Sequence, residues 1–130
     1  MSYRASAALQ SAVYACLSGD ETITAPVFDA APSGTLPETY VILGAEEVKD
    51  RSDADDWGAL HGFDVSVVST AAGFLEAKQV AAAIAVALED SDLSLSSGRL
   101  VWLKFLKGKA RRTAGGRQID LRFRAQIAAQ

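Results

Sequence analysis

The stretch QIDLRFRAQI, residues 118–127, has the strictest hydrophobic alternation in the chain. Every second residue is apolar, from Ile119 through Phe123 to Ile127, and every residue between them is polar or charged. An extended strand turns successive side chains to opposite faces. This stretch therefore predicts a strand with one buried face and one exposed face.

A second strand-like run, RLVWLKFLKGKARR at residues 99–112, precedes this stretch, and a glycine pair lies between the two. Glycine adopts positive φ angles at little cost, and tight hairpin turns need such angles. We expect Gly115 and Gly116 to supply them. The last third of the chain is thus predicted to be one long antiparallel hairpin.

The first part of the chain predicts a second hairpin and two helices. Residues 39–48 are rich in β-branched and aromatic side chains, and residues 63–68 alternate with a period of two. The polar residues 49–59 between them are predicted to form a loop. Helical spacing of apolar residues predicts helices over 5–18 and about 73–89.

The order helix, hairpin, helix, hairpin predicts a single α+β domain over residues 1–130. We expect a two-layer domain with a mainly antiparallel sheet of about four strands and both helices packed on one face. Residues 27–29 could add a short edge strand. A length of 130 residues fits one domain, since domains usually span ~100–200 residues.

The composition excludes several classes of protein. At 49% hydrophobic and 22% charged residues, the chain is too apolar for a disordered protein. One cysteine cannot form an internal disulfide, which fits a reducing compartment. No stretch approaches the ~20 apolar residues of a membrane-spanning helix, so we expect no membrane partner.

Charge is distributed unevenly along the chain. Residues 1–98 carry 4 basic and 15 acidic side chains, a net charge of −11, whereas residues 99–130 carry 9 basic and 1 acidic, a net charge of +8. The two parts add to the overall −3. Such a division predicts either a nucleic-acid-binding segment or two surfaces that attract one another.

The chain lacks the motifs of common catalytic and metal sites. It has no phosphate-binding loop, no G-x-S-x-G elbow, no H-E-x-x-H and no Cys/His cluster. The single histidine, His61, is expected to open a strand beside the charged loop, in a strand-edge or interface role. Cys16 lies on the apolar stripe of the first helix and is expected to be buried. We predict a protein that is not an enzyme and takes no cofactor or metal; an enzyme using His61 with a carboxylate is an open alternative.

Two groups of carboxylates resemble sites but do not fit them. Four residues from Asp53 to Asp64 match positions 1, 3, 6 and 12 of a calcium-binding loop, but Trp57 occupies position 5 and no helices flank the segment. We interpret it as a solvated loop. Glu46 and Glu47 are adjacent on a strand, so they point to opposite faces and cannot act on one substrate.

The basic C-terminal hairpin supports an alternative function, a small α/β nucleic-acid-binding module. Several phosphate contacts are needed for such binding, and exposed aromatic side chains would add base stacking. Trp102 and Phe105 are expected on opposite faces of their strand, with at least one of them in the core. The acidic remainder of the chain, with an overall pI near 5.1, opposes this alternative.

A series of short motifs, in order and spacing, resembles the tail-completion, or tail-terminator, proteins of long-tailed phages and gene transfer agents. The resemblance covers nearly the whole chain. It is carried by AALQSAVY at 7–14, VFD at 27–29 before Pro32, LPETYVILG at 36–44 before EE at 46–47, HGFDVSV at 61–67 and GFLEAK at 73–78.

This resemblance implies a structural protein of a virion or gene-transfer-agent tail, assembled in the bacterial cytoplasm. Family members form a homo-oligomeric, hexameric ring that caps the head-proximal end of the tail tube. The ring stops polymerisation of the tail tube protein and joins the tail to the head–tail connector, or stopper, protein. DNA passes through its channel without specific binding.

The charge distribution suggests how such a ring is held together. Each subunit of a ring presents two different surfaces, one to each neighbour. We predict that an acidic surface of one subunit approaches the basic hairpin of the next subunit or of a tail partner, which guides encounter and register. The predicted interface residues are Glu46, Glu47, Asp50, Arg51, Asp53, Asp55 and Asp56 on one side and Lys104, Lys107, Lys109, Arg111 and Arg112 on the other.

Overall fold

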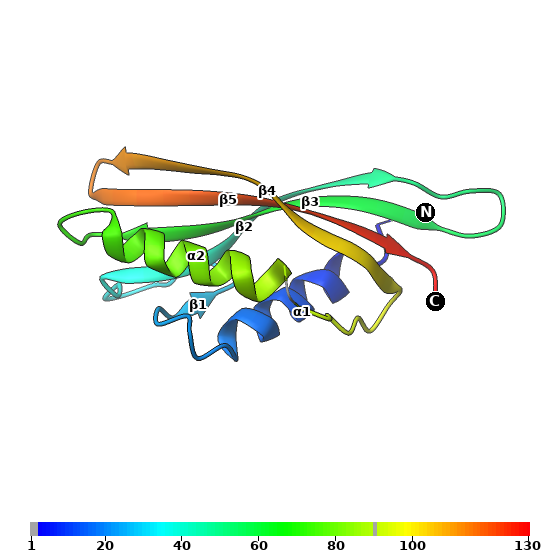
Figure 1. The fold of residues 1–130 in the computed structure, drawn as a ribbon, viewed down its shortest axis with the longest axis horizontal. Helices are drawn as coiled ribbons and strands as arrows, with labels where there is room; N and C mark the ends of the chain where they lie inside the picture. Colours follow the sequence, from blue (N-terminus) through cyan, green and yellow to red (C-terminus); the bar gives the residue numbers. More distant parts are fainter. Residues whose placement is uncertain (1–2, 90) are drawn as a thin grey trace.

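Two antiparallel hairpins make up most of the sheet in the computed structural model, which describes residues 3–89 and 91–130 (Figure 1). Their strands are β2 (Thr39–Asp50) with β3 (Gly58–Ser69), and β4 (Arg99–Thr113) with β5 (Gly116–Ala128). Strands β3 and β5 pair antiparallel in the middle of the sheet, where Val65 lies opposite Leu121. The two predicted hairpins are confirmed.

A fifth strand, β1 (Val27–Phe28), gives the sheet the order β1-β2-β3-β5-β4, one strand more than the four predicted. It is the short edge strand expected at residues 27–29. Val27 pairs with Val41 and Phe28 with Ile42, both in parallel, so the sheet is mixed. Because β1 contains only two residues, it covers a small part of the outer edge of β2.

Both helices pack on the same face of the sheet, as predicted (Figure 1). They are α1 (Ser6–Ser18) and α2 (Leu75–Glu89), each beginning one or two residues later than expected. Their apolar stripes are buried: Leu9, Val13 and Leu17 on α1, and Ala77, Val80, Ala81, Ile84 and Leu88 on α2. Within the described residues, no helix has the length and apolar character needed to cross a membrane.

The apolar side of β5 forms the centre of the core. Its five predicted core residues, from Ile119 to Ile127, are each at most 5% exposed. Phe123 stacks on Phe63 with ring centroids 5.6 Å apart, and Phe105 meets it edge-on at 5.7 Å. Burying each large apolar side chain contributes ~1.5–3 kcal/mol, so this row holds the helices to the sheet.

The turn between β4 and β5 is built differently from the prediction. In the described part of the chain only Gly34 and Gly98 have positive φ angles, so the expected role of Gly115 and Gly116 is wrong. Gly116 is required for space instead. A Cβ atom at this position would overlap the carbonyl oxygen of Ser69.

We expect Gly116→Ala to lower the free energy of unfolding by ~1–3 kcal/mol, because the added methyl group must displace the main chain at Ser69. Gly115→Ala is the matched control, since nothing lies within 4 Å of a Cβ atom built there. Urea unfolding of the two variants measures the difference. Equal midpoints for both variants would contradict this account of the turn.

Candidate interaction surface

One face of the sheet, which we call the open face, is covered by neither helix (Figure 1). Its centre holds two polar contacts between the paired strands β3 and β5. Arg122 Nε lies 2.7 Å from Asp64 Oδ1, and Ser66 Oγ donates a hydrogen bond of 2.6 Å to Asp120 Oδ1. Both contacts join residues that are direct neighbours in the strand register. The centre of the open face is therefore charged but internally paired.

Asp120 links three strands. Besides Ser66 on β3, it accepts hydrogen bonds from Gln118 on β5 at 2.8 Å and from Arg111 on β4 at 3.4 Å. Burial raises the pKa of Asp120, but the hydrogen bonds from Ser66, Gln118 and Arg111 outweigh it and bring the pKa below its usual value. The carboxylate therefore remains charged at neutral pH.

Two neighbouring hollows of about 240 and 280 Å³ lie against β4 and share Leu106 and Arg124. Small-molecule pockets are lined mainly by apolar side chains. The first hollow instead has four basic residues among its eight: it is lined by Glu47, Lys49, Arg51, Leu60, Gly62, Leu106, Arg122 and Arg124. This composition favours contact with a macromolecule over a small-molecule site.

The predicted basic residues lie along the exposed half of β4, the edge strand of the sheet. Residues 104–112 are all exposed. The structure brings together Lys104, Lys107, Lys109, Arg111 and Arg112, as the sequence predicted. Arg111 Nε lies 3.4 Å from Asp120 Oδ2, so one of these cations has a partner within the chain.

The aromatic residues of β4 differ from the prediction. Neither Trp102 nor Phe105 is in the core: Trp102 is half-buried, and Phe105 is 39% exposed although its ring contacts Phe123. Irregularities in the pairing at Leu100/Trp102 and at Phe105/Lys107 interrupt the alternation of the strand. Apolar surface is thus exposed beside the basic side chains.

The predicted acidic residues lie at the end of β2 and in the loop that follows. This loop is shorter than the expected 49–59, because β2 continues to Asp50 and β3 begins at Gly58. The backbone N–H groups of Asp56 and Asp55 donate to Asp53 Oδ1 at 2.8 and 2.9 Å and lower the pKa of Asp53. The described residues contain no group of three or more side chains placed to hold a metal ion.

Glu46 and Glu47 point to opposite faces, as predicted, and only one of them is free to meet a partner. Glu46 points toward the helices, where it accepts hydrogen bonds from Ser6 Oγ at 2.7 and 2.8 Å and from Tyr3 at 2.9 Å. Its side chain is 23% exposed. Glu47 lines the first hollow of the open face. The predicted role of Glu46 at an interface therefore conflicts with its contacts inside the chain.

The expected place of His61 at the start of a strand is wrong. His61 lies inside β3, between Val48 and Ala125 on the neighbouring strands, and is 0% exposed. Its Nδ1 atom lies 3.5 Å from Glu46 Oε2. Burial lowers the pKa of His61, and Glu46 opposes part of this effect. The side chain is thus a neutral part of the core at pH 7.

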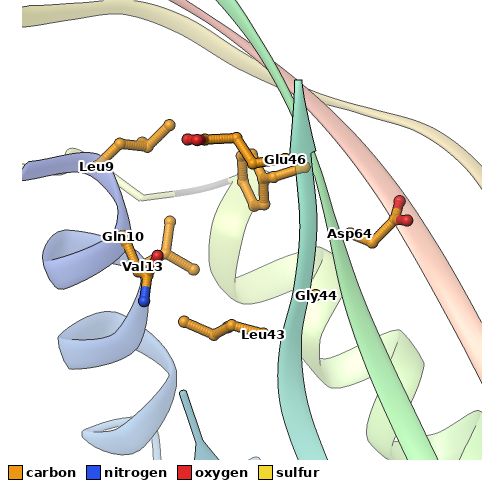
Figure 2. Close-up of a pocket in the computed structure, with 8 residues that line it drawn as sticks. Leu9, Gln10, Val13, Leu43, Gly44, Glu46 and Asp64 are labelled. Carbon is orange, nitrogen blue, oxygen red and sulfur yellow. The ribbon is translucent and has the colours of Figure 1, made fainter. Parts of the chain in front are cut away.

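The remaining candidates for chemistry show no catalytic geometry. Cys16 is half-buried, and its Sγ lies 3.9 Å from the carbonyl oxygen of Ala87. Burial raises the pKa of this thiol, and Asp20 raises it further. A cavity of about 30 Å³ lies between α1 and β2, far smaller than the ~300–1,000 Å³ of typical ligand sites. Figure 2 shows the residues that line it. Its one inward-facing carboxylate, on Glu46, is already hydrogen-bonded to α1.

The acidic and basic groups lie at opposite edges of the sheet, and their outermost members, in the β2–β3 loop and beside the β4–β5 turn, also lie at opposite ends. Figure 1 shows the β2–β3 loop at one end of the long axis and the β4–β5 turn at the other. Strands β3 and β5 separate β2 from β4. The two groups of one chain therefore cannot neutralise each other, and each is available to a different neighbour.

Sequence analysis missed the paired charges of the open face. The alternation of β5 places Asp120 and Arg122 on the polar side, but their partners Asp64 and Ser66 follow from the pairing of β5 with β3. The two contacts join residues 54 and 58 positions apart in the chain. A search for opposite charges at the same spacing on residues 63–68 and 119–124 would have found the Asp64–Arg122 pair.

Comparisons with known proteins find matches that cover nearly the whole chain. The family model of tail completion protein gp17 matches residues 11–128. A solved structure described as the virion of a native gene transfer agent (GTA) particle contains a chain that is 50% identical, with a TM-score of 0.92. The alignment covers 98% of this chain and 100% of that chain. A search of curated proteins finds no match.

Proposed function

The chain belongs to the tail completion protein gp17 family, as its sequence predicted, and from this premise we propose that it is a structural component of a virion or gene-transfer-agent tail. In this role it forms a hexameric ring at the head-proximal end of the tail tube. The ring ends polymerisation of the tube protein and joins the tail to the head–tail connector. No covalent bond is made or broken.

One observation carries the proposal: 50% identity over the full length of a chain from a gene transfer agent virion particle, with a TM-score of 0.92. The distribution of charge supports a ring, because a subunit needs two different, complementary surfaces to bind one neighbour on each side. The acidic end of β2 and the basic strand β4 have these properties.

The proposed partners follow from this position. The ring contacts a second copy on each side, the tail tube protein below and the connector above, and DNA passes through its channel without specific binding. Assembly takes place in the bacterial cytoplasm. Neither cofactor nor metal is required.

A second candidate, nucleic-acid binding, is favoured by one observation. Lys104 Nζ lies 5.0 Å above the ring of half-buried Trp102, and Phe105 is exposed beside them. Cations next to accessible aromatic rings are typical of single-strand binding surfaces. A DNA-binding titration at several salt concentrations tests it: steeply salt-dependent binding by a monomeric chain supports this candidate over the ring.

Removal of the chain from the producing cells tests the tail function directly. We expect particles in which tails are of abnormal length or are not joined to filled heads, and restoring the chain should restore both. Negative-stain imaging of the particles is the measurement. Tails of normal length joined to filled heads without the chain would overturn the proposal.

We expect Arg111→Glu combined with Arg112→Glu to weaken ring assembly and to abolish its dependence on salt, because two attractive charges on β4 become repulsive. Arg111→Lys with Arg112→Lys keeps the charge and is the matched control. Native mass measurement across a salt series gives the ring yield. An unchanged yield for the charge-reversed variant would remove β4 from the interface.

A further inference from the structure

Both outer edges of the sheet are open over a long stretch. The sheet ends at β4, and in the described part of the chain no strand pairs with its outer edge. On the other side, β1 pairs with β2 only at Val41 and Ile42, so among the described residues no strand pairs with the outer edge of residues 43–49. Open edges expose rows of backbone N–H and C=O groups that pair readily with another strand.

The open segments are exposed and opposite in charge. Residues 104–112 of β4 are all exposed and carry five basic side chains and no acidic one. Residues 43–50 of β2 carry Glu46, Glu47 and Asp50 against Lys49. Glu46 as a whole is exposed although its side chain is only 23% exposed, because its main chain lies on the open edge.

These charges decide which edges can meet. Like charges opposite one another destabilise a strand pair, and lysines on an edge strand discourage it from pairing with its own copy. Two β4 edges therefore repel each other, whereas a β4 edge attracts a β2 edge. A contact between two different edges has the property that a closed ring requires.

We propose that the open edge of β4 in one subunit forms backbone hydrogen bonds with the open edge of β2 in the next subunit. The inference rests on the ring of the proposed function and specifies its subunit contact. Strand β4 runs antiparallel to β5, β5 to β3 and β3 to β2, so β4 and β2 run in opposite directions. Rotation about a ring axis along the strands preserves these directions, and the new pair is antiparallel.

Closure of the sheets into a barrel sets the register. Strands in a barrel are staggered, and the eight-stranded barrel has a shear of eight, about one residue per strand. Each subunit adds the four long strands β2, β3, β5 and β4, hence a stagger of about four residues per subunit. The centres of the two open segments, near Glu47 and Gly108, are level with Arg124 and Leu121 on β5, three residues apart and close to this stagger.

Within one subunit, Glu47 is level with Gly62, Arg124 and Lys104 across the sheet. A shift of four residues along β5, from Arg124 to Asp120, leads to Lys109 on β4. The stagger therefore places Glu47 of one subunit opposite Lys109 of the next. Both side chains lie on the open face, so the pair is an opposite-charge contact within the new ladder.

The direction of the shift requires the helices on the outside of the ring. Crossovers between parallel strands, such as β3–α2–β4, are right-handed, and right-handed twist gives barrel strands a right-handed tilt. With the helices outside, the tilt of the strands shifts β2 of the next subunit along β4 toward the C-terminal end of β4. Glu47 of the next subunit then lies opposite Lys109 instead of Lys104. The open face then lines the channel, where Arg122 is paired with Asp64 and Arg111 with Asp120.

A cysteine pair tests both the contact and its register. Directly opposite residues in an antiparallel pair have Cα atoms ~4.5–5.5 Å apart, within the range of a disulfide. Within one chain the two positions are three strand spacings apart, which alone is ~14 Å, and they are also offset along the strands, so they cannot be bridged. We expect the Glu47→Cys/Lys109→Cys chain, oxidised in particles and as assembled rings, to form a covalent ladder up to the full ring.

The matched control is Glu47→Cys/Lys104→Cys, which would link only in an unstaggered ring. The unaltered chain, which retains Cys16, gives the background. Rings seen by imaging without the expected cross-link, or with the control cross-linked instead, overturn the edge contact while the tail function stands. Normal tails in the absence of the chain overturn the tail function itself, so the two failures are distinguishable.

Two further measurements do not depend on the cysteine variants. The register places Lys49 opposite Lys107, which is a like-charge contact. We therefore expect Lys49→Glu to raise the ring yield at low salt. A higher yield cannot result from misfolding of the variant. Amide hydrogen exchange at residues 44–50 and 104–112 should slow on passing from free chain to ring. A lower ring yield for Lys49→Glu, or unchanged exchange in either segment, contradicts the pairing.

Discussion

Phe123→Ala is expected to lower the free energy of unfolding by ~3–5 kcal/mol. The ring of Phe123 is 0% exposed and lies between Phe63 and Phe105. Truncation removes both aromatic contacts and leaves a cavity at the centre of the sheet, which the paired strands on either side cannot close. Since domains of this size are stable by ~5–15 kcal/mol, the variant should lose a large part of its stability.

Phe105→Ala is the matched control, because it removes one partner of the same aromatic cluster from a position that is 39% exposed. Its cost should be far smaller, since little cavity is created and the side chain already contacts solvent. Urea unfolding of both variants, with the slope compared as well as the midpoint, provides the measurement. Equal losses for the two variants would mean that Phe123 is not the centre of the core.

The core was predictable because its signal is local. The alternation of residues 118–127 fixed the buried side of β5, and helical spacing identified the stripes of α1 and α2. The features that were not predicted depend on contacts between residues far apart in the chain. The need for glycine at position 116 arises from the approach of Ser69, and the parallel orientation of the expected edge strand β1 arises from its pairing with β2.

The sign of the charge on each side of the candidate surface was predictable from the sequence, but the direction in which individual side chains point was not. The sequence separates acidic from basic residues, and the structure places the two groups at opposite edges of the sheet. It could not reveal that Glu46 turns toward Ser6, because this depends on where α1 packs. Nor could it place His61 in the core, since the length of the preceding loop is set by strand pairing between Asp50 and Ala59.

The stability of the fold should fall as the pH drops below about 6.5, and His61 is the expected cause. Burial places the pKa of His61 in the folded chain below its usual value of 6.5, so the unfolded chain takes up a proton at a pH where the folded chain does not. The unfolded state then binds more protons, and the free energy of unfolding decreases by up to ~1.4 kcal/mol per pH unit.

Asp53 and Asp120 do not produce this slope. Hydrogen bonds place the pKa values of Asp53 and Asp120 below the usual 3.8, so the stability they contribute is present above that pH and is lost only in stronger acid. His61→Gln removes the titrating ring from the core. We expect the unaltered chain to lose more stability than this variant between pH 6.5 and 5.5, by up to ~1 kcal/mol, as measured by urea unfolding.

Glu46→Gln tests how the Glu46 charge contributes to the pKa of His61. The Glu46 carboxylate lies 3.5 Å from His61 Nδ1 and raises the pKa of the ring against the effect of burial. Without that charge the folded pKa of His61 falls further, so the loss of stability should continue to lower pH than in the unaltered chain. The glutamine amide oxygen can still accept the hydrogen bonds of Ser6 and Tyr3, which keeps the contact with α1. If His61→Gln and the unaltered chain have the same slope between pH 7 and 5.5, then His61 takes up its proton at the same pH in the folded and the unfolded chain, and burial does not keep the ring neutral as described above.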